Sequence, residues 1–426
     1  MQRSSEEIKT RCACVIENKS IVALVGASGS PSAAHEMVFA ESKEIQRIKR
    51  ADGLRCCAEI ILPSIASSFQ PKPAMSAMTR HRQKRRKVMQ QKKRILTGDR
   101  PTGQLHIGHY VGTLKNRIRL QDEYECFFII ADLQVLTDHL DDHASIESNV
   151  YEVMCDYLGV GLRPENTFFV QSQVPELAEL TMYFSFLVTL ARLQRNPTVK
   201  DEAKTYEVTN MSYGFLGYPI SQAADILAFK ADLIPVGQDQ LPHIEQTREI
   251  VRSFNRVFGR EVFTLPHPLI GEVPILVGTD GNNKMSKSLD NFVAFAHSPQ
   301  EIEHRILNMV SDRKRAYRKD PGHPDECFAF KYWSIFSPND TPVVRQECEF
   351  ATRGCRDCKA QLASKLNEHL AEVRERRQRY VSQPDLVWDI LATGIRHART
   401  VAAETLVEVR EAMKIAFPKL PIKGGK

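Results

Sequence analysis

From Ile95 onward, short apolar runs alternate with stretches whose apolar residues recur at helical spacing. Such alternation predicts an α/β fold, a Rossmann-like doubly wound parallel sheet with helices on both faces. Ligands of such sheets bind at the carboxyl ends of the strands, and Asp132 directly follows the second run. In chain order, the runs and helical stretches are residues 95–96, 127–131, 146–158, 167–172 and 176–195.

The composition narrows the class of protein. The chain has 426 residues, 42% hydrophobic and 26% charged, which is typical of a soluble globular protein with two or three domains. Its longest apolar run, residues 126–131, is too short to span a bilayer, so no membrane association is expected. Ten cysteines without a secretory signal favour a reducing compartment, and we expect a cytoplasmic location.

Residues 1–90 differ from the rest and are expected to form a poorly ordered basic extension. Residues 81–94 hold eight Lys or Arg and no acid, so the remainder of the chain is close to neutral. The run could bind nucleic acid, serve as a targeting signal or be a disordered surface segment, or the whole extension precedes a true start near Met89. Glu6, Glu7 and Glu17 argue against an organelle transit peptide, which is poor in acids.

The strand that ends near Leu96 leads into a glycine-containing turn and then a helix. Gly98, Pro101 and Gly103 are turn residues, and residues 106–109 (His-Ile-Gly-His) fall on the first helical turn. Free backbone N–H groups make such a turn an anion site, and Gly108 lets a nucleotide approach the backbone. The alternative is an ordinary strand-to-helix turn with surface histidines.

A second segment, residues 284–288 (Lys-Met-Ser-Lys-Ser), follows a loop of turn-forming residues. Two lysines and two hydroxyls in five residues suit a mobile cationic clamp on a polyphosphate. Alone, such a pentapeptide is more often a solvated loop. Together with residues 106–109 it favours a nucleotide triphosphate site.

The pair of segments, HIGH and KMSKS, marks class I aminoacyl-tRNA synthetases. From about Leu96 to about Met413, the chain resembles the bacterial-type tryptophanyl-tRNA synthetases. The resemblance implies ATP-dependent activation of L-tryptophan with Mg2+, transfer to tRNA(Trp), and a homodimer. It assigns charge stabilisation in catalysis to His106, His109, Lys284 and Lys287. It assigns ATP binding to Arg100, Pro101, Thr102, Gly108, His109, Gly237, Gln238, Asp239, Lys284, Met285, Ser286, Lys287 and Ser288.

A second helix is expected to carry the amino-acid pocket. Tyr218, Gln222 and Asp225 are spaced i, i+4 and i+7, and therefore share one helix face. Asp225 lies among apolar neighbours, where an unpaired charge would be costly, although a surface acid is the plainer interpretation. The resemblance assigns Asp225 to the indole N–H, and Tyr218, Gln222 and Gln240 to the substrate. A tyrosine pocket needs a similar acid, so tyrosine–tRNA ligase is an alternative.

Four cysteines follow the second segment, with the spacing C-x20-C-x6-C-x2-C. Thiolates at this spacing can bind Zn2+ or hold a four-iron cluster, and four ordinary core cysteines are the alternative. Some tryptophanyl-tRNA synthetases carry a [4Fe–4S] cluster in the anticodon-binding region, which favours iron–sulfur over zinc. The four are Cys327, Cys348, Cys355 and Cys358.

The C-terminal part is expected to be helical. Leucines from Leu362 onward form one apolar stripe, and arginines between residues 374 and 379 are expected to form a solvated basic face that could contact anticodon-stem phosphates. We predict a catalytic domain over residues 91–297, a helical anticodon-binding domain over 298–396, and a last helix over roughly 399–416 in a C-terminal segment, 397–426. A synthetase-like protein that binds nucleic acid without catalysis is the remaining alternative.

Overall fold

The computed structural model describes residues 11–17, 20–26, 35–39, 92–138, 140–205, 210–270, 276–282, 285–287 and 289–417. Contacts divide the chain into two units, Met1–Gln90 and Gln91–Lys426. In the first unit, β1 (Arg11–Glu17), β2 (Ser20–Gly26) and β3 (His35–Phe39) form an antiparallel sheet in that order. The basic run up to Gln91, and most of the extension expected to be poorly ordered, lie outside the described residues.

The second unit is built on a five-stranded parallel sheet with the order β6-β5-β4-β7-β8. The chain winds outward from β4 in one direction and then from β7 in the other, so the predicted Rossmann-like doubly wound fold is confirmed. The strands are β4 (Arg94–Asp99), β5 (Glu125–Ile130), β6 (Thr167–Val170), β7 (Leu233–Val236) and β8 (His267–Ile270).

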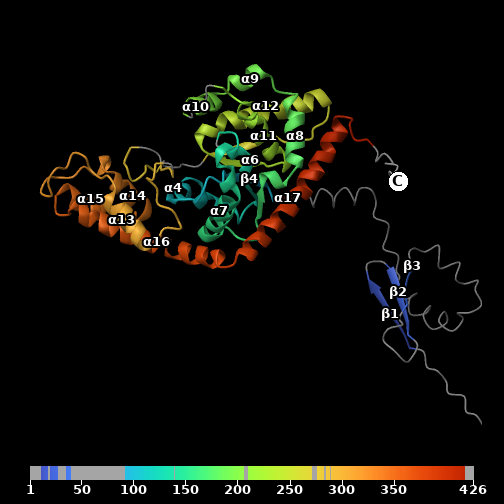
Figure 1. Ribbon diagram of the computed structural model, residues 1–426, viewed down its shortest axis with the longest axis horizontal. Coiled ribbons are helices and arrows are strands. Elements are labelled where there is room, and N and C mark those ends of the chain that lie inside the picture. Colours follow the sequence, from blue (N-terminus) through green and yellow to red (C-terminus); the bar gives the residue numbers. More distant parts are fainter. Residues whose placement is uncertain are drawn as a thin grey trace, which may run out of the picture. The chain divides into compact units, whose positions relative to one another are not determined.

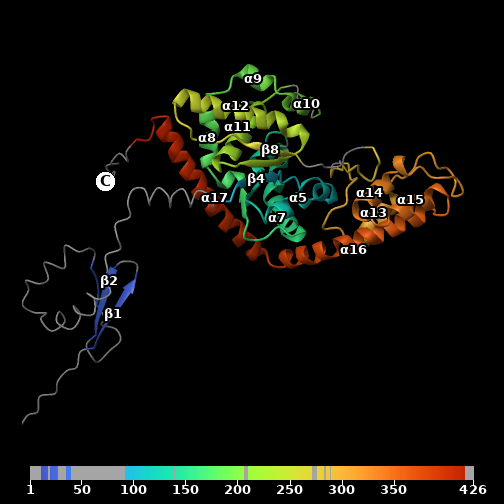
Figure 2. The ribbon, with the colours of Figure 1, turned by 180° about the vertical axis from the view of Figure 1, so that it is seen from behind.

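Helices cover both faces of this sheet (Figures 1 and 2). The apolar side chains of the strands divide between two cores. Phe128 and Phe168 pack with α7 on one face, and Phe127 and Phe169 pack with α8 and α11 on the other. The helices up to the last strand are α4 (Ile107–His109), α5 (Lys115–Leu120), α6 (Asp132–Val135), α7 (Ile146–Val160), α8 (Glu176–Ser185), α9 (Leu190–Gln194), α10 (Pro197–Thr205), α11 (Tyr213–Ala228) and α12 (Leu241–Phe258).

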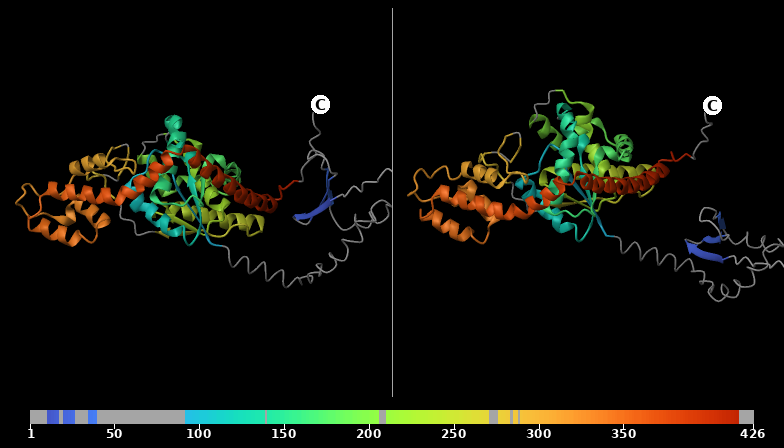
Figure 3. Two further views of the ribbon diagram at one scale, coloured as in Figure 1. Left: turned by 90° about the horizontal axis from the view of Figure 1, so that it is seen from below. Right: turned by 60° about the horizontal axis from the view of Figure 1, so that its bottom comes forward.

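The chain beyond β8 is helical, as predicted. The apolar stripe of α16 is fully buried, beginning with Leu362 and Leu366, and α13 and α14 pack against this helix (Figure 3). The helices are α13 (Pro299–Asn308), α14 (Phe328–Phe336), α15 (Thr341–Glu349), α16 (Cys355–Val381) and α17 (Pro384–Ala412). Short 3-10 or π segments are η1 (Tyr110–Leu114), η2 (Leu140–Ser145), η3 (Gln171–Gln173), η4 (Gln238–Gln240) and η5 (Pro324–Glu326).

Two helix predictions were wrong in extent. The expected helix over 176–195 is two helices, because the chain turns after Phe186 and Thr189 caps α9 by accepting the Arg192 N–H. The expected last helix over 399–416 begins earlier, with Pro384 in its first turn. The expected domain boundary between residues 396 and 397 therefore falls inside α17.

Helix α17 packs along β6 and α11 (Figure 1). At Gly394 an added Cβ would lie 2.0 Å from the Phe168 carbonyl oxygen, so only glycine permits this approach to the sheet edge. Further along, the Thr405 hydroxyl donates to the Ala228 carbonyl at 2.7 Å. The C-terminal part of α17 is thus held against the parallel-sheet core.

Candidate active site

A cavity of about 280 Å3 opens at the carboxyl ends of β4 and β7, where the winding direction of the sheet reverses. This is the position at which doubly wound sheets bind their ligands. Residues 96–100 of the β4 end and residues 234–237 of the β7 end line it, and α11 closes one side. Among the predicted site residues, those that line it are Arg100, Tyr218, Gln222, Asp225, Gly237 and Gln240.

The segment 106–109 lies beside this cavity without lining it. It forms the short helix α4, which runs directly into η1 and α5. The His106 N–H donates to His109 Nδ1 at 3.2 Å, and the two ring centroids are 3.8 Å apart. The Ile107 N–H donates to the Val293 carbonyl at 3.0 Å, so the turn is tied to the chain that follows the second segment.

The two predicted phosphate segments, residues 106–109 and the described residues 285–287 of the second, meet in space. An added Cβ at Gly108 would lie 2.8 Å from His106 Nδ1 and 3.5 Å from the Met285 Cβ, so the glycine leaves room for both side chains. The Lys287 ammonium donates to the Thr102 hydroxyl at 3.2 Å. Burial lowers the pKa of Lys287 to about 8, against Asp156 and Asp99, which raise it.

Other residues of the two segments are fixed by local contacts. The Ser286 N–H donates to Asn291 Oδ1 at 2.7 Å, and Met285 is buried. Pro101 is buried, and Arg100 forms an ion pair with Asp138. Lys284 and Ser288 lie outside the described residues, so their predicted roles stay predictions.

Asp225 lines the cavity and has a relative exposure of 4%. Gln171 Nε2 donates to both of its carboxylate oxygens, at 3.0 and 2.8 Å. Burial raises the pKa of Asp225 to about 7, and Asp132 adds to this while the Gln171 hydrogen bond opposes it. Asp225 is thus a buried acceptor whose desolvation is costly and which a ligand N–H could satisfy. A ligand-binding role therefore accounts for this acid better than a position on the helix surface does.

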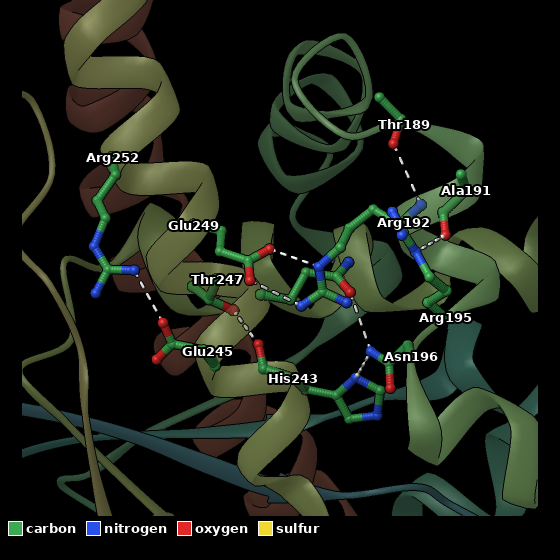
Figure 4. Close-up of polar contacts among 11 residues, drawn as sticks. Thr189, Ala191, Arg192, Arg195, Asn196, His243, Glu245, Thr247, Glu249 and Arg252 are labelled. Carbon is green, nitrogen blue, oxygen red and sulfur yellow. Dashed lines mark hydrogen bonds and ion pairs between the residues drawn. The ribbon is translucent and has the colours of Figure 1, made fainter.

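Tyr218 belongs to a buried polar cluster that the sequence did not reveal. Its hydroxyl donates to Glu202 Oε2 at 2.6 Å and lies 3.0 Å from His243 Nε2. Asn196 in turn lies against His243, whose pKa is lowered to about 4 by burial despite Asp239 (Figure 4). Glu202 and His243 also line the cavity. No spacing rule connects them to Tyr218, since they come from α10 and α12.

The loop after β7 supplies the remaining predicted ATP contacts. Gly237 lines the cavity, and Gln238 and Asp239 begin η4. The Asp239 carbonyl accepts the Thr198 hydroxyl at 3.0 Å, and its carboxylate accepts Gln240 Nε2 at 2.9 Å. The Thr198 contact ties the backbone of the loop to α10.

A buried ion pair forms part of the cavity wall and was missed in the sequence. Arg117 Nη1 donates to Asp99 Oδ2 at 2.6 Å, and the Tyr157 hydroxyl donates to the same oxygen at 2.7 Å. Burial by itself raises the pKa of Asp99, but Arg117, His109 and the hydrogen bonds outweigh it and lower the pKa to about 2. Asp99 is the last residue of β4, so this cluster fixes the start of the turn that leads to His106.

The four predicted metal ligands are not grouped as a metal site in this structure. Over the described residues, which include all four cysteines, no three His, Cys, Asp or Glu side chains are grouped to hold a metal ion. The thiols instead accept hydrogen bonds: Cys358 from the Trp333 indole at 3.3 Å, and Cys355 from Arg315 at 3.8 Å. Burial raises the pKa of Cys327 to about 11, and Cys358 and Cys348 add to this.

The predicted solvated basic face also needs correction at Arg377. This side chain is buried and paired with Asp156 and Glu152 of α7. Arg379, by contrast, is exposed and pairs with Glu375 one turn earlier. None of the helices that the structure describes is long and apolar enough to cross a membrane.

Known proteins match both the sequence and the fold. The family described as tRNA synthetases class I (W and Y) matches residues 88–371. A tryptophan–tRNA ligase of Clostridium longisporum is 46% identical over 331 residues, covering 76% of this chain and 97% of that protein. The tryptophan–tRNA ligase of Streptococcus pyogenes serotype M1 is 46% identical over 334 residues, covering 76% and 98%.

The structural comparison agrees. The crystal structure of tryptophanyl-tRNA synthetase from Campylobacter jejuni, complexed with ADP and tryptophan, matches with a TM-score of 0.68 and 31% identity. It covers 75% of this chain and 99% of that one. With a cavity at the switch point of the sheet and two phosphate segments in contact beside it, the chain belongs to the class I tRNA synthetases for tryptophan and tyrosine, among the tryptophan–tRNA ligases.

Proposed function

We propose that this chain is a tryptophan–tRNA ligase that activates L-tryptophan with ATP and transfers it to tRNA(Trp). The observation that carries the proposal is the placement of Asp225. This acid is buried at one end of a cavity whose other walls come from the turns after β4 and β7. Because the chain resembles tryptophan–tRNA ligases over almost their whole length, the acid is assigned to the indole N–H.

The chemistry needs positioning more than proton transfer. The tryptophan carboxylate attacks the α-phosphorus of ATP, the bond to the bridging oxygen breaks, and pyrophosphate leaves. A terminal ribose hydroxyl of the tRNA then attacks the adenylate carbonyl and displaces AMP. Mg2+ bound together with ATP would neutralise part of the charge on the phosphates.

The residues beside the cavity supply complementary charge. The Lys287 ammonium lies beside the Thr102 hydroxyl, from where it can reach phosphate oxygens bound at the turn. His106 and His109 lie on the same turn, and the proposal gives them hydrogen bonds to the phosphates. Lys284 is assigned the same role on the basis of the sequence motif alone. Preorganised donors of this kind stabilise the charge that builds up on the phosphates in the transition state.

Discrimination between tryptophan and phenylalanine, which has no side-chain donor, belongs to the same proposal. The hydrogen bonds from Gln171 hold the Asp225 carboxylate in one orientation, so the direction from which a ligand can donate to it is defined. Gln222 Nε2 donates to Gln240 Oε1 at 3.4 Å, and both line the cavity near the substrate's polar end. A site built on one buried acceptor rejects ligands that cannot donate to it.

The remaining parts of the proposal concern assembly and location. We assign residues 91–297 to catalysis, 298–396 to tRNA anticodon binding and 397–426 to a C-terminal segment, with the enzyme in the cytoplasm as a homodimer. The apolar side chains of Met182, Phe186 and Leu190 are exposed where α8 ends and α9 begins, and we propose that they face a second copy of the chain.

The reaction requires no metal at the four cysteines. A [4Fe–4S] cluster or Zn2+ there stays a separate prediction, without support from the geometry of their thiols. Iron, zinc and acid-labile sulfide content per chain of the purified protein tests it directly.

Charging of tRNA(Trp) tests the function. The purified chain is mixed with labelled tryptophan, ATP, Mg2+ and a tRNA(Trp) transcript, and acid-precipitable label is followed. Charging that needs all four components supports the proposal. A protein that binds the tRNA but never forms the adenylate would instead support the non-catalytic alternative.

A further inference from the structure

A buried ion pair links the C-terminal helical region to the turn that carries His106. Arg377 on α16 has a relative exposure of 8%, and Asp156 on α7 has 0%. Arg377 Nε donates to Asp156 Oδ1 at 2.7 Å, and its Nη2 also contacts Glu152. Two charges removed from water in this way are held only because they satisfy each other.

The second oxygen of the same carboxylate holds the active-site turn. The Leu105 N–H donates to Asp156 Oδ2 at 2.6 Å, and Leu105 is the residue immediately before His106. The Leu105 carbonyl accepts the Phe295 N–H at 3.3 Å, so both of its backbone groups are fixed. Asp156 is therefore a single group that ties the backbone of the turn to a side chain of α16.

Close packing makes this connection stiff. An added Cβ at Gly159 would lie 2.9 Å from the Arg377 Cβ, which shows that α7 and α16 cross without a gap. Arg376 Nε donates to the Gly159 carbonyl at 2.8 Å, and the Tyr151 hydroxyl donates to the Val381 carbonyl at 3.3 Å. Movement of α16 here would have to carry α7 with it.

A second contact between α16 and the turn lies nearer the N-terminal end of this helix. The ring of His369 meets Tyr110, the residue after His109, edge-on with centroids 5.5 Å apart. The other end of α16 begins at Cys355, about 33 Å from Arg377 along a helix of this length. One continuous helix thus joins the cysteine-bearing region to both sides of residues 106–109.

We infer that Arg377 is a positioning residue for the activation step, acting through Asp156 to hold the Leu105–His106 backbone where the ATP phosphates bind. Arg377 does not line the cavity, whereas Asp225, the residue proposed to bind tryptophan, lines it from α11. Its loss should affect the use of ATP and leave the binding of tryptophan intact. The inference rests on the proposed function of the cavity.

The test compares Arg377→Met, Asp156→Asn and the double variant with wild type and with Arg252→Met. Arg252 is exposed, pairs with Glu245 on α12 and serves as the matched control (Figure 4). The double variant removes both charges, and the asparagine oxygen can still accept the Leu105 N–H, so it guards against simple unfolding. The readouts are tryptophan-dependent ATP–pyrophosphate exchange, tryptophan affinity by calorimetry without ATP, and thermal unfolding.

We expect kcat/KM for ATP to fall at least tenfold in Arg377→Met and in the double variant, with tryptophan affinity within twofold of wild type. Arg377→Lys should recover part of the loss, since an ammonium can still pair with Asp156. A folded double variant with wild-type constants for ATP overturns the inference, as does an equal loss of tryptophan affinity. A wild-type chain without tryptophan-dependent exchange overturns the proposed function itself and this inference with it.

Discussion

Lys287 and Thr102 are joined by a hydrogen bond of 3.2 Å, although 185 residues separate them in the chain. Thr102 stands in the turn after β4, and Lys287 in the segment that follows β8. Around this contact, Gly108 gives room to Met285, and Val293 accepts the Ile107 N–H. The two phosphate segments therefore form one surface beside the cavity.

Replacement of Lys287 by alanine should slow adenylate formation while sparing tryptophan binding. Loss of one preorganised donor at developing charge typically costs about 10²–10³-fold in rate. ATP–pyrophosphate exchange and tryptophan calorimetry measure the two effects. Lys314→Ala, at an exposed lysine that pairs with Glu326, is the control and should leave both unchanged. Unaltered exchange in Lys287→Ala would refute the role of this lysine.

Gly108→Ala should weaken catalysis through crowding. The new Cβ would stand 2.8 Å from His106 Nδ1, a separation that real Cβ atoms do not tolerate. We expect at least a tenfold loss of exchange, with a stability cost of about 1–3 kcal/mol from overpacking. Gly214→Ala is the matched control, because its Cβ would meet nothing closer than 3.8 Å. Equal activity of the two variants would contradict the packing argument.

Tryptophan affinity should rise with pH and then level off. Burial raises the pKa of Asp225 to about 7, so in the free enzyme the carboxyl is protonated below that pH and ionised above it. The ionised form is the better acceptor for an indole N–H, and each pH unit below 7 should weaken binding by up to about tenfold. Titration calorimetry between pH 5.5 and 8.5 measures this. Asp225→Asn should bind more weakly and lose the pH dependence; a variant that keeps the wild-type pH profile would assign it to another group.

The Asp99–Arg117 pair should stabilise the fold above acid pH. The pKa of Asp99 in the folded protein, about 2, lies below the ordinary value of 3.8. The contribution of the ion pair to the free energy of unfolding is therefore present above pH 4 and is lost as the pH falls toward 2. This difference corresponds to about 2 kcal/mol. Arg117→Met leaves the carboxylate buried and unpaired, and should cost about 3–5 kcal/mol in urea unfolding at pH 7. Arg119→Met, on the exposed side of the same helix, should cost less than about 1 kcal/mol.

Local patterns in the sequence predicted the sheet and the substrate helix well. The apolar runs marked β4, β5 and β6, and the i, i+4, i+7 spacing placed Tyr218, Gln222 and Asp225 on one face of α11, where all three line the cavity. The helix prediction depends on the period of about 3.6 residues and the strand predictions on short apolar runs, and both are local features of the sequence. Helix ends were less predictable, because the break before Thr189 depends on a cap and a turn.

Contacts between segments that are distant in the chain could not be predicted from the sequence. Glu202 and His243 reach Tyr218 from α10 and α12, and Arg377 reaches Asp156 from α16; only the packing of helices brings them together. Arg377 belongs to an arginine-rich stretch that predicts a solvated face, and tertiary pairing overrides that pattern. At the four cysteines, spacing suggested a ligand set, whereas the folded chain turns two of the thiols toward Trp333 and Arg315.

The most direct test of the account is ATP–pyrophosphate exchange by the full chain with tryptophan, tyrosine and phenylalanine in parallel, each with a sample that lacks amino acid. The account predicts rapid exchange with tryptophan and a kcat/KM at least 10⁴-fold lower with phenylalanine, because Asp225 would then be left without a hydrogen-bond donor. Exchange that is equally fast with tyrosine, or that does not depend on the amino acid, would contradict it.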